Sequence, residues 1–179
     1  MRPSKPAAQM TTAELAAYID HSILKPEFTP EDVRREVEAA VGFGCKTVCI
    51  NPASIEIAKP LCEGTATGVC VVVDFPFGAS TTASKAAQAR LAVEAGIDEL
   101  DIVANYGWIR AGLMEEVEAD LRAVVEVCHA DGVAVKVIFE TDTLTEEQIR
   151  AAAEASIAAG ADFIKTSTGF YTGTSQHEA

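Results

Sequence analysis

The sequence predicts an α/β fold, a (β/α)8-type TIM barrel of which this chain contains only about six β/α units. Short apolar runs alternate without interruption with helical patterns, which is typical of a parallel sheet covered by helices. A register repeats as well: five residues after a helix-ending glycine, a polar residue stands inside an apolar strand, namely Cys49, Asp101 and Lys165. The rival fold, an open doubly wound sheet, usually has a glycine-rich turn after its first strand, and residues 24–27 contain no glycine.

The first part of the chain is predicted to contain three strands. Residues 1–10 are expected to form a loose tail, and a capping-box pattern at Thr11 begins a short helix that runs to about Ile19. Strands are expected at residues 19–24, 47–50 and 68–75. Pro30 and Pro52 stand where prolines are favoured, at the first positions of the intervening helices.

The second part continues the same alternation. It is expected to form a helix over 80–95, a strand over 99–105, a long helix to about 130, a strand over 133–140 and a helix from Thr145 to Gly160. The strand that holds Lys165 follows, and its apolar run predicts burial on both faces. Since no linker interrupts the pattern, residues 1–179 are predicted to be a single, incomplete barrel domain.

The composition excludes several functions. The net charge is -13, which disfavours a nucleic-acid partner. No run is long enough for a membrane span, and no secretory signal is recognisable at the start. Five cysteines without framework spacing favour a reducing, cytoplasmic location. Cys45 and Cys49 lack the spacing and the following histidine of a zinc site, so neither a metal nor another cofactor is expected.

A lysine inside a buried strand is costly unless it is paired, or neutral and reactive. Lys165 is therefore a candidate Schiff-base nucleophile, although it could instead reach water from the strand end. Alternate barrel strands contribute side chains to one interior layer, so Asp101, Cys49 and Lys165 are expected to meet inside the barrel. A carboxylate beside the amine would transfer protons, while the plainer alternative is a structural ion pair.

The sequence leaves alternative roles open for the other polar residues in or near the strands. Lys136 is either a second cation near the site or the structural partner of Glu140 or Asp101. Asp20, expected to close the first strand, either binds a substrate hydroxyl or caps the strand. Thr168 belongs to a run of hydroxyl residues with free backbone N–H groups, which is either a binding loop or a plain turn. Asp74 is expected to face solvent, no role is assigned to His21 and His129, and three cysteines are expected in the core: Cys62, Cys70 and Cys128.

Six stretches together resemble the deoxyribose-phosphate aldolase family of class I aldolases, whose fold is a TIM barrel. They are IDHSILKP (19–26), TVCINP (47–52), FPFG (75–78), DELD (98–101), KVIFET (136–141) and KTSTGF (165–170). The resemblance implies reversible cleavage of 2-deoxy-D-ribose 5-phosphate to D-glyceraldehyde 3-phosphate and acetaldehyde, without a metal. It also implies a Schiff base on Lys165 and proton relay by Asp101. By the same resemblance Asp20, Ser22 and Cys49 line the substrate pocket, and the backbone of Gly169 contacts the phosphate.

The family barrel has eight strands, whereas this sequence ends shortly after the sixth. The seventh strand, with a second lysine, and the eighth strand, with a phosphate loop, are therefore expected to be missing from this sequence. Three explanations stay open: the sequence is a fragment of a longer protein, two chains cover each other's open edges as a homodimer, or the chain is a poorly active remnant. Two alternatives to the aldolase follow. One is a shortened, non-catalytic relative that acts through self-association, and the other is a lysine aldolase with a different donor.

Overall fold

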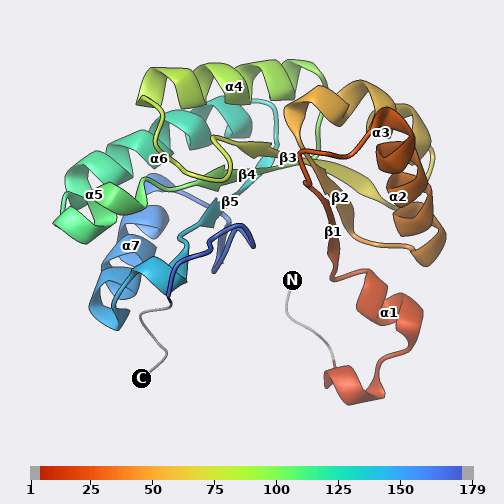
Figure 1. Cartoon of the computed structure of the whole chain (residues 1–179), viewed down its shortest axis with the longest axis horizontal. Helices are drawn as coiled ribbons and strands as arrows, with labels where there is room; N and C mark the ends of the chain where they lie inside the picture. Colours follow the sequence, from red (N-terminus) through yellow and green to blue (C-terminus); the bar gives the residue numbers. More distant parts are fainter. Residues whose placement is uncertain (1–4, 175–179) are drawn as a thin grey trace. The chain divides into compact units, whose positions relative to one another are not determined.

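The computed structural model describes residues 5–174, which divide into two compact units, residues 5–71 and residues 72–174. The elements of the first unit are η1 (Ala7–Gln9), α1 (Thr12–Ala16), β1 (Asp20–Ile23), α2 (Pro30–Phe43), β2 (Thr47–Ile50), η2 (Pro52–Ser54) and α3 (Ile55–Cys62). Strand β3 (Gly68–Val73) begins in the first unit and ends in the second (Figure 1). The elements of the second unit are α4 (Thr82–Glu94), β4 (Glu99–Val103), α5 (Tyr106–Ala111), α6 (Met114–His129), β5 (Ala134–Ile138), η3 (Thr141–Thr143), α7 (Glu146–Ala159) and β6 (Phe163–Lys165).

In the first unit β1 pairs with β2 and β2 with β3, and all three strands are parallel. The register places Ser22 opposite Cys49, and Cys49 opposite Cys70. Helix α2 begins at a capping box on Thr29, with proline at its first position. Its apolar stripe at i, i+4 and i+7 is buried: Val33, Val37 and Ala40.

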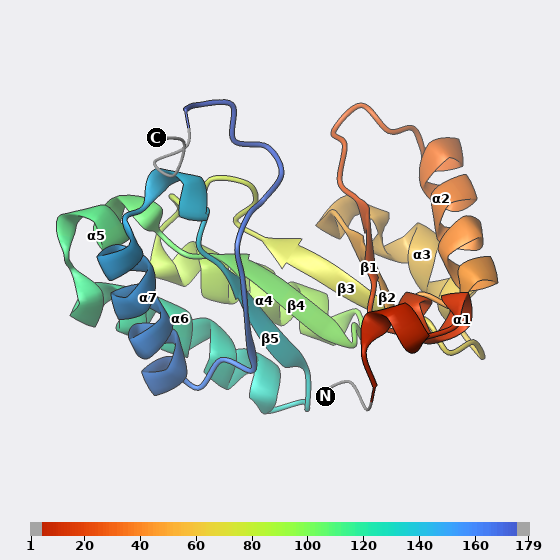
Figure 2. The same ribbon diagram turned by 90° about the horizontal axis from the view of Figure 1, so that it is seen from below.

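In the second unit β4 pairs with β5 and β5 with β6, again in parallel. Helix α6 lies between α4 and α7, and the three helices cover one side of these strands (Figures 1 and 2). Helix α7 begins at the predicted capping box on Thr145 and ends at Gly160 in the left-handed conformation. The single long helix expected after the fourth strand is wrong, because Gly112 adopts the left-handed conformation and ends α5 before α6 begins.

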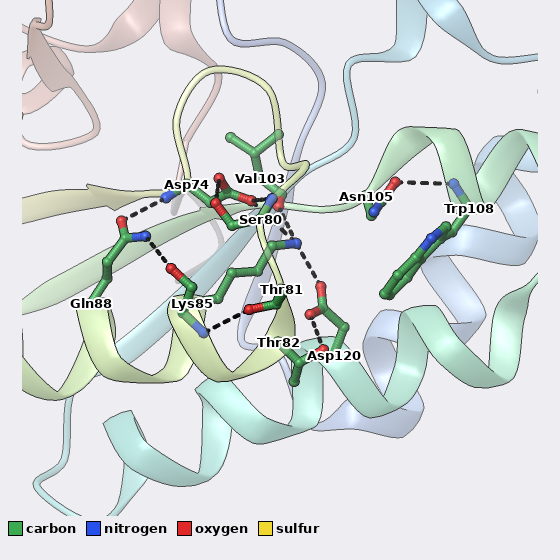
Figure 3. A network of polar contacts seen from close by, with 11 residues as sticks. Asp74, Ser80, Thr81, Thr82, Lys85, Gln88, Val103, Asn105, Trp108 and Asp120 are labelled. Atoms are coloured by element: carbon green, nitrogen blue, oxygen red, sulfur yellow. Dashed lines mark hydrogen bonds and ion pairs between the residues drawn. The ribbon is translucent and has the colours of Figure 1, made fainter.

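A buried polar network joins α4, α6 and the end of β4; we name its charged members Lys85, Asp120 and Asp74 the Lys85 cluster (Figure 3). The Lys85 side chain is fully enclosed, and its Nζ lies 2.6 Å from Asp120 Oδ2 and 3.6 Å from Asp74 Oδ2. Lys85 also donates to the backbone oxygen of Val103, and Thr82 donates to Asp120. One cation therefore ties two helices to one strand.

Asp74 in this cluster corrects the expectation that it faces solvent. Its carboxylate accepts hydrogen bonds from the backbone N–H and the hydroxyl of Ser80, so it closes the loop between β3 and α4 (Figure 3). The same loop approaches β4 closely at Gly78, where an added Cβ would lie 2.3 Å from the Ala104 oxygen. The loop is thus held both by a charged side chain and by backbone contact.

The remaining expectations on the elements are mostly confirmed, with boundaries shifted by a few residues. Asp20 begins β1 and does not close it. Residues 7–9 of the expected loose tail form one 3-10 turn, and residues 1–4 lie outside the described part. The cysteines expected in the core are buried. No helix among residues 5–174 is both long and apolar enough to cross a membrane.

Candidate active site

Asp101 lies at the centre of the candidate site, in the middle of β4. Its side chain is almost completely enclosed, and each of its two carboxylate oxygens faces a different lysine. Lys165 Nζ lies 2.5 Å from Oδ2, and Lys136 Nζ lies 3.0 Å from Oδ1. One carboxylate therefore bridges an amine from β5 and an amine from β6.

Lys136 has a second carboxylate partner that the sequence did not point out. Glu99 Oε2 lies 2.6 Å from Lys136 Nζ, and both side chains are buried. Glu99 precedes Asp101 by two positions on β4, so the two carboxylates project from the same face of the strand. We name Asp101, Lys136, Glu99 and Lys165 the Asp101 cluster. Two carboxylates balance two potential cations within it.

The charge state of Asp101 follows from these neighbours. Burial on its own would raise the pKa of Asp101, because it disfavours the charged form. The positive charges of Lys136 and Lys165, together with their hydrogen bonds, outweigh burial and lower the pKa below the ordinary value. Asp101 is thus a carboxylate at neutral pH, and it accepts a hydrogen bond from each of the two lysines.

Lys165 differs from the rest of its cluster in exposure. About a third of its side chain, 30 %, is accessible, against 8 % for Lys136. The register sets Lys165 opposite Ile138, two residues farther along the sheet than the pair of Asp101 with Lys136. The amine nevertheless reaches back to Asp101, so Lys165 is both held by the carboxylate and open to a small molecule.

The expected burial of this last strand on both faces is wrong. Phe163 and Ile164 are 47 % and 53 % exposed. Strand β6 contains three residues and pairs with β5, and these two consecutive side chains project to opposite faces of the sheet, so neither face is fully covered here. The apolar run therefore identified a strand correctly but overestimated its burial.

The segment after Lys165 is held by Glu140. The Thr168 backbone N–H donates to Glu140 Oε2 at 3.2 Å, and the Thr168 hydroxyl donates to the same oxygen. The expectation of free backbone N–H groups is therefore wrong at Thr168. Gly169 follows in the left-handed conformation, with φ of 81°, and is exposed. Phe170 packs edge-on against Phe75 from the β3–α4 loop.

Three of the predicted substrate contacts belong to the first unit. Asp20 accepts a hydrogen bond from the Thr47 hydroxyl at 2.8 Å. Ser22 and Cys49 are opposite one another on β1 and β2, with Ser22 exposed and Cys49 buried. The first unit thus presents these three side chains on two neighbouring strands, and their approach to Lys165 stays a prediction.

Comparison with known proteins identifies the family. The profile of the DeoC/LacD family aldolases matches residues 14–179. This chain belongs to that family. It is 46% identical to the deoxyribose-phosphate aldolase of Desulfitobacterium hafniense over 164 residues, which cover 92% of this chain and 75% of that protein. The corresponding enzyme of Thermococcus gammatolerans is 45% identical over 166 residues, 92% of this chain and 74% of its own length.

Solved structures agree with this assignment. The aldolase QR15 superposes with a TM-score of 0.83 at 36% identity, over 89% of this chain and 70% of its own. The deoxyribose-phosphate aldolase of Aeropyrum pernix, described as a tetramer, gives 0.80 at 32% identity over 90% and 68%. The predicted α/β fold of TIM-barrel type is confirmed. By its relatives, the chain belongs to the deoxyribose-phosphate aldolases, which are lyases.

The structure of the site also corrects and extends the predictions that were made from the sequence. Lys136 pairs with Asp101, one of its two predicted structural partners, and also with Glu99. His21 and His129, to which no partner was assigned, lie 3.4 Å from Glu36 and 2.9 Å from Asp162. Glu99 was missed although its spacing of two from Asp101 was a usable signal. Glu140 was missed as a loop anchor, because its partner Thr168 is 28 residues away.

Proposed function

We propose that Lys165 of this aldolase is the amine that forms the Schiff base, and that Asp101 moves the protons. The observation that carries the proposal is the 2.5 Å contact between Lys165 Nζ and Asp101 Oδ2 at a side chain that remains partly accessible. The proposed reaction is reversible cleavage of 2-deoxy-D-ribose 5-phosphate to D-glyceraldehyde 3-phosphate and acetaldehyde. We propose that residues 1–179 act in it as a single aldolase domain.

The two lysines around Asp101 are not equivalent, which supports Lys165 as the nucleophile. Lys136 is enclosed and touches two carboxylates, Glu99 and Asp101, so its positive charge is well compensated. Lys165 shares one of these carboxylates and faces an opening. A second cation beside Asp101 makes it less costly for Lys165 to give up its proton. Only the neutral amine attacks a carbonyl carbon.

The proposed steps balance as follows. The Lys165 amine adds to the substrate aldehyde, and loss of water gives an iminium. A base removes the proton of the C3 hydroxyl, the C2–C3 bond breaks, and its electron pair moves toward the iminium to give an enamine. Glyceraldehyde 3-phosphate leaves. Protonation of the enamine carbon and addition of water release acetaldehyde and restore the amine. Asp101, which is charged and hydrogen-bonded to both lysines, relays protons in these steps.

We further propose roles in substrate binding for the remaining predicted residues. Gly169 would offer its backbone N–H to the phosphate, because the residue is exposed and follows the catalytic strand directly. Thr168 would shape this loop through Glu140 more than by contact with substrate, since its N–H and hydroxyl are already used. Asp20, Ser22 and Cys49 would contact the sugar, and Lys136 would supply a second cation.

A trapping experiment tests the proposal. Acetaldehyde with borohydride should reduce the imine and leave an ethyl group on Lys165, which peptide mass spectrometry would locate. Label on another lysine, or none in a folded sample, would contradict the proposal. Substrate profiling with and without the 5-phosphate distinguishes the proposed reaction from another lysine aldolase, because only the former should depend strongly on the phosphate.

We also propose that the chain forms a homodimer in the cytoplasm. Exposed Phe163 and Ile164 on β6 support an apolar contact between chains, and the five buried cysteines fit a reducing compartment. Light scattering after gel filtration should show a dimer, and Phe163→Ser should shift it toward the monomer. A wild-type monomer would contradict this. A folded oligomer without any trapped adduct would instead support the non-catalytic alternative.

A further inference from the structure

Glu140 is a buried carboxylate in an uncommon backbone position at the end of β5. Its side chain is 2 % exposed, and its φ of 56° is in the left-handed region, which residues other than glycine seldom adopt. Such a conformation persists where the surroundings enforce it, and it is frequent at functional sites. The reason for it should be visible in what the carboxylate contacts.

Each of residues 139–141 contacts the segment that follows Lys165 or Lys165 itself. The Phe139 N–H donates to the Lys165 oxygen at 3.1 Å, and the Thr141 N–H donates to the Thr166 oxygen at 2.9 Å. Between these two backbone hydrogen bonds, the Glu140 carboxylate accepts hydrogen bonds from the N–H and the hydroxyl of Thr168. Figure 2 shows this last described segment, in dark blue, running alongside β5. Three consecutive residues thus fix the chain from Lys165 to Thr168.

The loop is ordered further by the same threonine. The Thr168 hydroxyl donates to Glu140 and accepts from the Phe170 N–H at 3.0 Å. This pair of bonds encloses Gly169 between two anchored residues. The Glu140 carboxylate therefore acts on Gly169 indirectly, by holding the preceding residue Thr168.

The second carboxylate oxygen of Glu140 shows that stability alone does not explain the residue. Oε1 is buried and has no hydrogen-bond partner among residues 5–174. A buried acceptor left without a donor costs free energy, so a carboxylate that served only to hold the loop would be a poor choice. Burial raises the pKa of Tyr106, and the charges of Glu140 and Tyr171 add to this, so the field of the carboxylate extends to a neighbouring ring.

We infer that Glu140 is a positioning residue for the aldolase reaction: through Thr168 it fixes the loop after β6, so that Lys165 faces Asp101 and the Gly169 N–H faces the substrate phosphate. The inference rests on the proposed function of Lys165. It predicts that loss of the carboxylate misplaces the amine while the fold is kept. Small misplacements of reacting groups reduce rates strongly.

The test compares Glu140→Ala, Glu140→Gln, Thr168→Val and the Ala/Val double variant, with Glu154→Gln on the exposed face of α7 as matched control. The readout is the rate of borohydride trapping of acetaldehyde on Lys165, with kcat and KM measured separately. We expect about a tenfold or larger loss for Glu140→Ala, since misplacement of this kind costs up to about a hundredfold. Glu140→Gln, whose amide oxygen still accepts from Thr168, should recover most of the rate, and the control should match wild type.

The double variant decides whether Glu140 acts through Thr168. We expect it to be no slower than Glu140→Ala, because the two residues form one contact. The inference is overturned if the rate losses of the two single variants multiply in the double variant, or if Glu140→Ala keeps the wild-type rate. Should Glu140→Ala fail to fold, Thr168→Val decides, since it keeps the carboxylate and the backbone N–H. A several-fold slower rate supports the inference and a wild-type rate overturns it.

Hydrogen exchange separates this inference from the proposed function. If wild type is not labelled on Lys165, the proposed function fails, and exchange of the peptide 163–171 still tests the loop. Faster exchange in Glu140→Ala than in wild type and Glu154→Gln supports the anchoring role. Unchanged exchange overturns it.

Discussion

The second unit contains two clusters of buried lysine and carboxylate groups that differ in charge balance and access. The Lys85 cluster has one cation and two carboxylates, and the lysine is fully enclosed (Figure 3). The Asp101 cluster has two lysines and two carboxylates, and Lys165 remains 30 % exposed. Both use the same residue types. They differ in that the Lys165 amine is partly accessible, whereas the Lys85 side chain is not.

This difference separates a structural ion network from a reactive one. Lys85 contacts two carboxylates and a backbone oxygen, and its side chain is fully enclosed. Lys165 shares its carboxylate with a second cation, which favours proton release, and it lies at a strand end. Charge balance and exposure together therefore support the proposal that Lys165 is the nucleophile, whereas burial of a lysine by itself would not.

The largest expected effect is on chemistry, for Lys165→Met. The variant should lose the borohydride-dependent labelling, because it removes the partly accessible amine that contacts Asp101. The stability should change little, since the side chain is partly exposed. Mass spectrometry and a denaturation curve check both parts. Labelling at the wild-type level would show that the Asp101 cluster is not the reactive one.

Lys85→Met should have the largest effect on stability. Removal of the lysine leaves Asp120 and Asp74 buried without their cation, and breaking a buried pair costs about 3–5 kcal/mol. Urea denaturation measures the loss. Arg90→Met on the same helix is a matched control, because it removes an exposed cation and should change the free energy of unfolding by less than about 0.5 kcal/mol. If Lys85→Met and Arg90→Met lowered the free energy of unfolding equally, the Lys85 cluster would not have the structural role that distinguishes it from the Asp101 cluster.

Asp101→Asn should reduce the trapping rate by about 10²- to 10⁴-fold, the usual contribution of a positioned acid or base. It should also change the pH dependence of stability. The pKa of Asp101 is lowered in the fold, so its stabilising contribution is present above the ordinary aspartate pKa of about 3.9 and is lost as the pH falls through the folded value.

The free energies of unfolding of wild type and Asp101→Asn, measured from neutral to acid pH, check this sign. Their difference should be constant above about pH 5 and should shrink below about pH 4. A difference that instead grows on acidification would mean that Asp101 is not charged in the fold.

The smallest expected effect is that of Thr82→Val. It removes one hydrogen bond to Asp120 and leaves the ion pair with Lys85, so it should cost about 1 kcal/mol. Thermal unfolding measures it, and labelling of Lys165 should be unchanged. A reduced trapping rate at unchanged stability would show that the two clusters are coupled.

The sequence predicted the elements better than the environment of each side chain. The capping box at Thr145 and the glycine at 160 mark the limits of α7, because caps act within a few residues. Asp101 and Lys165 could be paired from the repeated register, because the parallel strands follow a fixed alternation. Glu140 could not be paired with Thr168, since a side-chain contact over 28 residues leaves no local pattern.

The two lysine clusters show the same limit. Lys85 is on a helix and reads as a surface residue, and only the packing of α6 against α4 encloses it with Asp120. Strand β6 reads as buried, and only the arrangement of its neighbours leaves Phe163 and Ile164 exposed. Burial depends on which elements pack together, and periodicity within one element does not contain that information.

The sequence by itself determined the alternation of strands and helices, the family, and the candidate pair of amine and carboxylate. These follow from local spacing and residue type. The tertiary structure decided that Lys136 is compensated by Glu99, that Lys165 keeps access, and that Glu140 holds the loop. Charge compensation and accessibility depend on distances between groups that are remote in the chain, and only folding sets those distances.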